Sequence, residues 1–67
     1  MTMKNKNAQV IASGEGFDFW KIGNEVYRAR VNEQLDVNGY PQAKRWECSI
    51  ESWKNFRQVF AWAKDVN

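Results

Sequence analysis

The sequence has no histidine, a single cysteine and a single proline among its 67 residues. Because Cys48 stands alone, no intramolecular disulfide can form. A structural zinc site normally takes four cysteine or histidine ligands, which this chain cannot supply. Small domains commonly rely on one of these devices to reinforce a small core. We therefore expect no metal and no cofactor, and stability has to come from elsewhere.

Long hydrophobic runs are also missing. The apolar run at residues 10–12 is far shorter than the roughly 20 residues that span a bilayer or the core of a signal peptide. We expect no contact with a membrane. One unpaired cysteine suits a reducing compartment, so the cytoplasm is the expected location. The net charge of +2 permits an acidic partner without requiring one.

Aromatic residues are what the chain has in abundance, with four Trp, four Phe and two Tyr. Each buried ring removes roughly 150–250 Å² of surface from water. At about 25 cal/mol per Å² this is on the order of 4–6 kcal/mol of gross transfer free energy per ring. We expect these rings to make a small core sufficient.

The N-terminal part divides at residue 8. Residues 1–7 are polar and aperiodic, which predicts a disordered tail, and residues 8–67 are expected to form one small domain. Residues 8–12 are a candidate short strand, ended by the sequence Gly14-Glu15-Gly16.

A β-hairpin is the clearest local pattern. Residues 17–22 and 25–31 are rich in β-formers and flank Gly23-Asn24. Glycine supplies the positive φ that two-residue hairpin turns need. Asn38-Gly39 predicts a second turn, and residues 43–48 a further strand after it.

The C-terminal part has helical spacing. Ser49 is a candidate N-cap, and from Ile50 to Asp65 the apolar residues recur every three or four positions. The expected fold is therefore α+β. It comprises a three-stranded antiparallel β-meander, or a four-stranded one if residues 8–12 pair, packed against one C-terminal amphipathic α-helix.

The predicted hairpin register pairs Trp20 with Tyr27 and sorts the side chains into two faces. One face carries Trp20, Ile22, Tyr27, Ala29 and Val31. The other carries Phe17, Phe19, Lys21, Val26, Arg28 and Arg30. The first face has fewer charges, so we expect it to meet the helix. The rings expected to build the core are Trp20, Tyr27, Trp46, Trp53, Phe56 and Phe60.

The second face interleaves phenylalanines with cations, and Arg45 is expected to extend it. Such a face has two interpretations. Arginines lying over Phe rings form cation–π pairs on a solvated surface without any partner. Alternatively, aromatic rings beside cations form a stacking platform for RNA or single strands, or a basic sheet face that enters a DNA groove.

The run YRARV, a turn, AKRWECSI and an amphipathic helix, spanning Tyr27 to Lys64, is similar in element order to integrase arm-binding domains. The same order occurs in the related plant-type sheet-reading DNA-binding domains. The resemblance implies three strands in the major groove with one helix packed behind them. It also implies that DNA is contacted by Arg28, Arg30, Lys44 and Arg45.

Catalysis is not expected. A nucleophilic cysteine needs a nearby base, and Cys48 in a predicted strand beside Trp46 is expected to be buried and inert. Glu47 and Glu51 are expected to be solvated surface. No glycine-rich phosphate loop is present, because Gly14-Glu15-Gly16 lacks the lysine and helix such loops need.

A binding role remains. Trp62, at the edge of the helical apolar arc, and Tyr40, in a turn, are rings without an expected place in the core, and such rings dominate interface hot spots. We expect a non-catalytic regulator or inhibitor, of the kind phages encode, that binds a protein. A nucleic acid is the alternative partner, a homodimer is open, and no small-molecule substrate is expected. The candidate surface is Phe17, Phe19, Lys21, Arg28, Arg30, Arg45 and Trp62.

Overall fold

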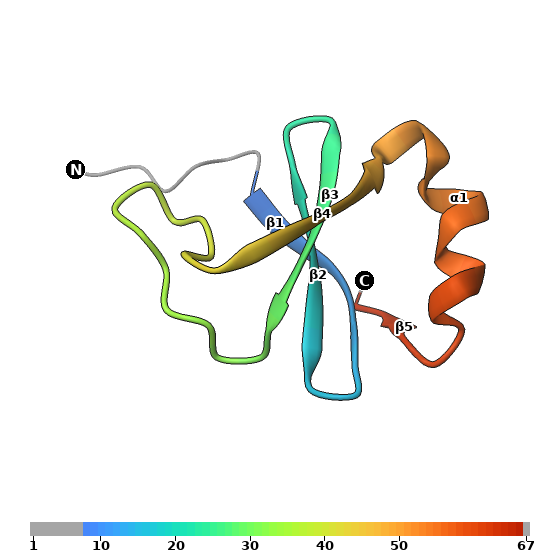
Figure 1. Ribbon diagram of the computed structural model, residues 1–67, viewed down its shortest axis with the longest axis horizontal. Coiled ribbons are helices and arrows are strands. Elements are labelled where there is room, and N and C mark those ends of the chain that lie inside the picture. The colour runs from blue at the N-terminus through green and yellow to red at the C-terminus, as the bar shows by residue number, and fades with distance from the viewer. Residues whose placement is uncertain (1–7, 67) are drawn as a thin grey trace.

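The fold is a five-stranded antiparallel sheet with one short helical segment packed on it, so the α+β prediction is confirmed (Figure 1). The computed structural model describes residues 8–66, and the expected N-terminal tail lies outside them. The strands are β1 (Ala8–Gly14), β2 (Phe17–Ile22), β3 (Glu25–Arg30), β4 (Lys44–Ser49) and β5 (Lys64–Asp65). They lie in the spatial order β4-β3-β2-β1-β5.

Two tight turns set the register of the first three strands. Glu15 and Gly16, between β1 and β2, both have positive φ, at 52° and 83°. This is the backbone of a type I′ hairpin turn, whose twist matches that of the flanking strands. Gly23 has φ 63° between β2 and β3. The predicted pairing of Trp20 with Tyr27 is confirmed.

The sheet has one strand more than the four-stranded alternative of the prediction. Residues 8–12 do pair, as part of β1, along β2. The fifth strand, β5, forms because the chain returns to the sheet after the helix, where Ser13 pairs with Lys64. The Val66 N–H then donates to the Ile11 carbonyl at 3.2 Å. A two-residue strand that pairs across 51 positions leaves no periodic pattern in the sequence.

The helical segment begins as predicted and ends early. The Ser49 side chain accepts a hydrogen bond from the Ser52 N–H at 3.3 Å. The segment consists of η1 (Ile50–Ser52), α1 (Trp53–Phe56) and η2 (Arg57–Phe60). The prediction that the helix continues to Asp65 is therefore wrong.

Close packing against β1 accompanies the early end of the helix. A Cβ atom on Gly14 would lie 3.0 Å from the Trp62 carbonyl oxygen and 3.2 Å from the Ala63 Cα. Only glycine lets the backbone of the segment after the helix approach the sheet this closely. The chain then enters β5 instead of extending the helix past the sheet.

The core lies between the helix and the face that carries Phe19. Phe19 and Val26 are fully buried, and the other members of this cluster are Ala12, Cys48, Trp53 and Ala63. The Phe19 ring centroid lies 4.8 Å from that of Phe60 and 5.3 Å from that of Trp53. The prediction that the Trp20 and Tyr27 face meets the helix is therefore wrong.

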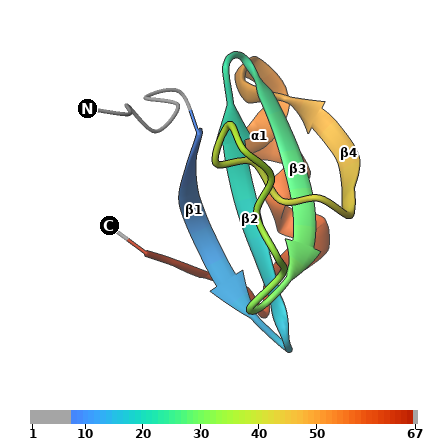
Figure 2. The ribbon, with the colours of Figure 1, turned by 90° about the vertical axis from the view of Figure 1, so that its left-hand side faces the viewer.

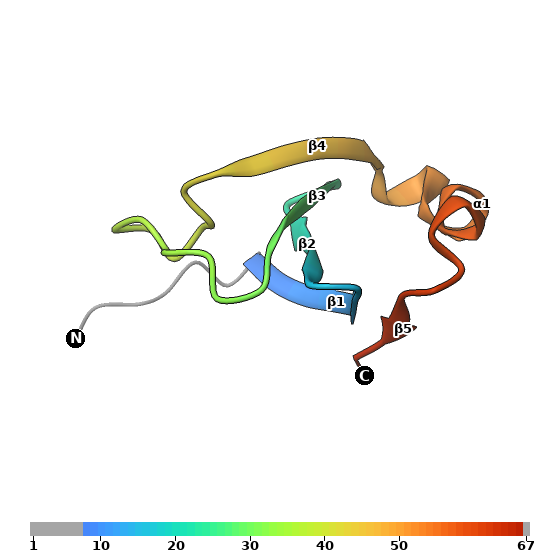
Figure 3. The same ribbon diagram turned by 60° about the horizontal axis from the view of Figure 1, so that its bottom comes forward.

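The sheet is the middle one of three layers. Figure 3 shows the helix on one side of the strands and the connection between β3 and β4, residues 31–43, on the other. In Figure 2 this connection crosses in front of β2 and β3, while α1 lies behind them. We call the two sides of the sheet the helix face, which carries Phe19 and Val26, and the loop face, which carries Trp20 and Tyr27.

Candidate binding surfaces

Three aromatic rings lie in a row across the loop face. Tyr27 on β3 pairs with Trp20 on β2 and with Trp46 on β4, so all three side chains share one face. Trp20 and Tyr27 are half-buried, whereas Trp46 is 55% exposed. The prediction that Trp46 belongs to the core is therefore wrong, because the helix packs on the other side.

The exposed Trp46 side chain is held in place by a hydrogen bond. Its indole Nε1 donates a 2.7 Å hydrogen bond to Glu25 Oε1 from the neighbouring strand. A charge-assisted hydrogen bond thereby limits the movement of a large apolar ring in solvent. This is the most exposed aromatic ring among the described residues.

The connection between β3 and β4 is a small hydrogen-bonded hairpin of its own. Asp36 and Tyr40 pair through an N–H to carbonyl bond of 2.7 Å, and Gln42 donates to the Gln34 carbonyl at 2.8 Å. The Asp36 carboxylate also accepts from the Asn38 and Tyr40 N–H groups, at 2.8 and 3.0 Å. The predicted turn at Asn38-Gly39 is confirmed, with Gly39 at φ 86°.

Apolar side chains project from this hairpin into solvent. Leu35 is 40% exposed, and Val37, next to the turn, is 91% exposed. Pro41 is buried and bridges to Leu35, which anchors the base of the hairpin. The ammonium group of Lys44 lies 5.8 Å from the ring centroids of both Tyr27 and Tyr40, so the hairpin contacts the loop face.

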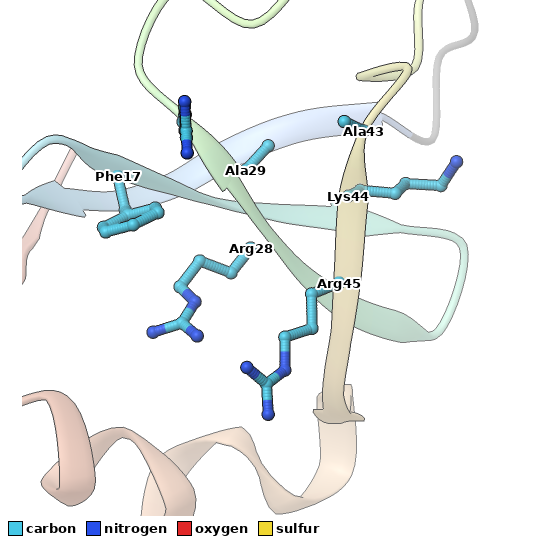
Figure 4. Close-up of a pocket in the computed structure, with 7 residues that line it drawn as sticks. Phe17, Arg28, Ala29, Ala43, Lys44 and Arg45 are labelled. Atoms are coloured by element: carbon cyan, nitrogen blue, oxygen red, sulfur yellow. The ribbon is translucent and has the colours of Figure 1, made fainter.

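A basic cavity lies across β2, β3 and β4. Its volume is about 410 Å³. The lining residues are Phe17, Arg28, Ala29, Arg30, Ala43, Lys44 and Arg45. In Figure 4 the side chains of Arg28 and Arg45 extend together from neighbouring strands, while Lys44 points away from them. Four cationic residues thus line the cavity and no carboxylate does, although the Lys44 ammonium group itself lies near Tyr27 and Tyr40.

Arg28 is fixed within the wall of this cavity. Its guanidinium carbon lies 5.0 Å from the Phe17 ring centroid and 5.4 Å from that of Phe60. Its Nε lies 3.1 Å from Glu47 Oε2. The Glu47 side chain is only 8% exposed, so the expectation of a solvated Glu47 is wrong. The register shift between Val26 and Tyr27 leaves Glu47 as the extra residue of a bulge, turned toward Arg28.

Arg45 is different. It is the cross-strand partner of Arg28 and shares its face, as predicted, but that face is the helix face and not the outer face that the sequence suggested. It is exposed, and no ion pair holds it or Arg30 within residues 8–66.

The residues of the predicted binding surface lie in three different environments in the structure. Phe17 borders the cavity with Arg28, Arg30 and Arg45. Phe19 is 0% exposed, so its assignment to the surface is wrong: it is the ring around which the core is built. Trp62 is 37% exposed, yet its centroid lies 5.8 Å from Phe19 and 5.7 Å from Phe60. Trp62 therefore covers one side of the core.

Cys48 is buried, as predicted. Burial, followed by the nearby Glu47 and Glu25 carboxylates, raises the pKa of its thiol above the ordinary value of 9.0. The thiol therefore carries a proton at neutral pH. Within the described part of the chain no three His, Cys, Asp or Glu side chains gather as a metal site. No described helix is long and apolar enough to cross a membrane.

Comparisons of this chain with protein-family models, with characterised proteins and with solved structures find no match. The element order that resembles integrase arm-binding domains is present, but its implied geometry is not. In that arrangement the contacting side chains face away from the helix. Here Arg28 contacts the Phe60 ring of the helical segment, and Arg45 shares its face.

Proposed function

We propose that this protein is a small non-catalytic binding module, of the kind phages encode, that regulates or inhibits a larger protein. Its binding surface is the loop face with the adjoining hairpin, centred on Trp46, Leu35 and Val37. The observation that carries the proposal is the exposed Trp46 ring held by Glu25 at 2.7 Å.

Trp is the residue most enriched among interface hot spots, where truncation costs about 2 kcal/mol or more. Immobilising a side chain on binding costs about 0.5–1.5 kcal/mol. Because the hydrogen bond to Glu25 already restricts the ring, much of this cost is met during folding.

The hairpin supplies a second contact element. Asp36 fixes its tip by three hydrogen bonds, as acceptor from Asn38, Tyr40 and Gly39. An apolar Val37 that is 91% exposed gains nothing from folding and is available to a partner.

The charge near Trp46 indicates the character of the partner's rim. Lys44 is exposed, and its ammonium group lies 5.8 Å from the ring centroid of Tyr27, the cross-strand neighbour of Trp46. A positive charge beside an apolar centre favours a partner with an apolar pocket and an acidic edge, and it accelerates their association.

The experiment compares Trp46→Ala with Val59→Ala. Val59 is 66% exposed, and it lies on the helical segment, away from the loop face. Proteins captured by the wild-type chain from its source cells are identified, and the affinity of the purified partner is measured by calorimetry. We expect Trp46→Ala to weaken binding about 30-fold or more and Val59→Ala to leave it unchanged.

Circular dichroism establishes that both variants are folded. A folded Trp46→Ala protein that binds the partner as tightly as wild type contradicts the proposal. Sedimentation of the chain alone decides whether the partner is a second copy of the same chain.

A further inference from the structure

The basic cavity lies outside the loop face and has an electrostatic arrangement that the fold itself does not require. Arg28 and Arg45 are directly opposed on neighbouring strands. Like charges in this position destabilise a sheet. Glu47 compensates Arg28 at 3.1 Å, but no carboxylate compensates Arg45 or Arg30 within residues 8–66.

The composition of the cavity wall specifies the kind of ligand. Arg28, Arg30 and Arg45 contribute three guanidinium groups, of which Glu47 compensates one, whereas the Lys44 ammonium group lies near Tyr27 and Tyr40 on the loop face. Guanidinium groups present paired donors that match the oxygens of a phosphate. The half-buried Phe17 ring in the same wall offers an aromatic surface.

We propose that this cavity binds the sugar-phosphate backbone of single-stranded nucleic acid. Arg45 and Arg30 contact phosphates, Arg28 holds a fixed guanidinium group beside them although Glu47 compensates its charge, and Phe17 lies against a base. Positively charged grooves with aromatic side chains bind single strands in this way, largely without sequence preference.

The shape of the site favours a single strand over a duplex. Reading a duplex requires a helix or ribbon that protrudes into the major groove. Here the arginines line a surface depression of about 410 Å³, open to solvent, instead. An unpaired strand can bend its phosphates and bases into such a space, whereas the stacked bases of a duplex cannot leave the helix without cost.

Fluorescence anisotropy tests the proposal with labelled 12-nucleotide DNA and RNA strands, the matching duplex, and polyglutamate of similar charge. We expect both single strands to bind at low salt, more tightly than the duplex or polyglutamate. Preferential binding of polyglutamate would identify an acidic protein segment as the ligand and overturn the proposal, as would the absence of binding to single strands.

Matched double variants locate the site. Arg30→Gln with Arg45→Gln removes two cavity cations, and Lys54→Gln with Lys64→Gln removes two exposed cations from α1 and β5. Each single-strand phosphate contact contributes about 0.7 to the slope of log K against log salt. The cavity variant should therefore lower that slope by about 1.4 and weaken binding at least tenfold, while the control stays near wild type.

Equal weakening by both double variants would indicate a diffuse effect of net charge and would overturn the cavity as the site. The outcome is independent of the proposed protein-binding function, because Trp46→Ala leaves the cavity lining intact. Failure of one proposal can thus be distinguished from failure of the other.

Discussion

The large aromatic side chains on the two faces of the sheet differ in how deeply they are buried. On the helix face Phe19 contacts rings from the helical segment and is fully buried. On the loop face Trp46 lies on an edge strand with more than half of its surface in solvent. Both faces carry aromatic residues, so ring content alone does not determine which face is covered.

The difference shows how charge is tolerated on a covered face. Arg28 is on the helix face, yet its side chain is only 22% exposed. Two aromatic rings and one carboxylate surround its guanidinium group, so the charge is compensated. The loop face has fewer cations but lacks a helix to cover it. Counting formal charges therefore selects the wrong face.

Phe19→Ala should produce the largest effect on the helix face. Removing a fully buried ring costs about 3–5 kcal/mol, from lost transfer free energy and the cavity left behind. In a chain of 67 residues this is a large share of the total stability. The measurement is the free energy of unfolding in urea, and a loss below about 1 kcal/mol would place Phe19 outside the core.

Gly14→Ala tests how closely the segment after the helix approaches the sheet. The added Cβ would lie 3.0 Å from the Trp62 carbonyl oxygen, a backbone atom that cannot rotate away. We expect a loss of about 1–3 kcal/mol, as for overpacked sites. Thermal unfolding measures it, and a stability equal to or above wild type would show that the segment is not pressed against β1.

The smallest effect concerns Cys48 at alkaline pH. Its folded pKa is raised above 9.0 by burial and by neighbouring carboxylates. Above pH 9.0 the unfolded thiol releases its proton while the folded one retains it, so stability falls as pH rises through this range. Wild type should therefore lose more unfolding free energy between pH 8 and 10 than Cys48→Ala does, and identical losses would refute the shift.

Local sequence signals predicted a large part of the fold. Gly23 and Asn24 specified the hairpin and its register, Ser49 specified the helix start, and Asn38-Gly39 specified the second turn. These features depend on a few adjacent residues whose backbone preferences are strong. They fixed which side chains share a face, including Arg28 with Arg45.

Long-range features could not be predicted in the same way. β5 pairs with β1 through only two residues, and the close approach of Trp62 to Gly14 depends on that pairing. Glu47 turns inward because of a bulge that no turn residue signals. For the candidate surfaces, the sequence identified the cations of the cavity but assigned Trp46 to the core.

Trp46 and Trp53 provide the most direct test, because the same substitution can be made on both faces. Trp53, in α1 against the helix face, is 8% exposed, and Trp46, on the loop face, is 55% exposed. We predict that Trp53→Ala lowers the free energy of unfolding by about 3–5 kcal/mol and Trp46→Ala by about 1 kcal/mol or less. Equal losses for the two variants would contradict the division of the sheet into a covered face and an open one.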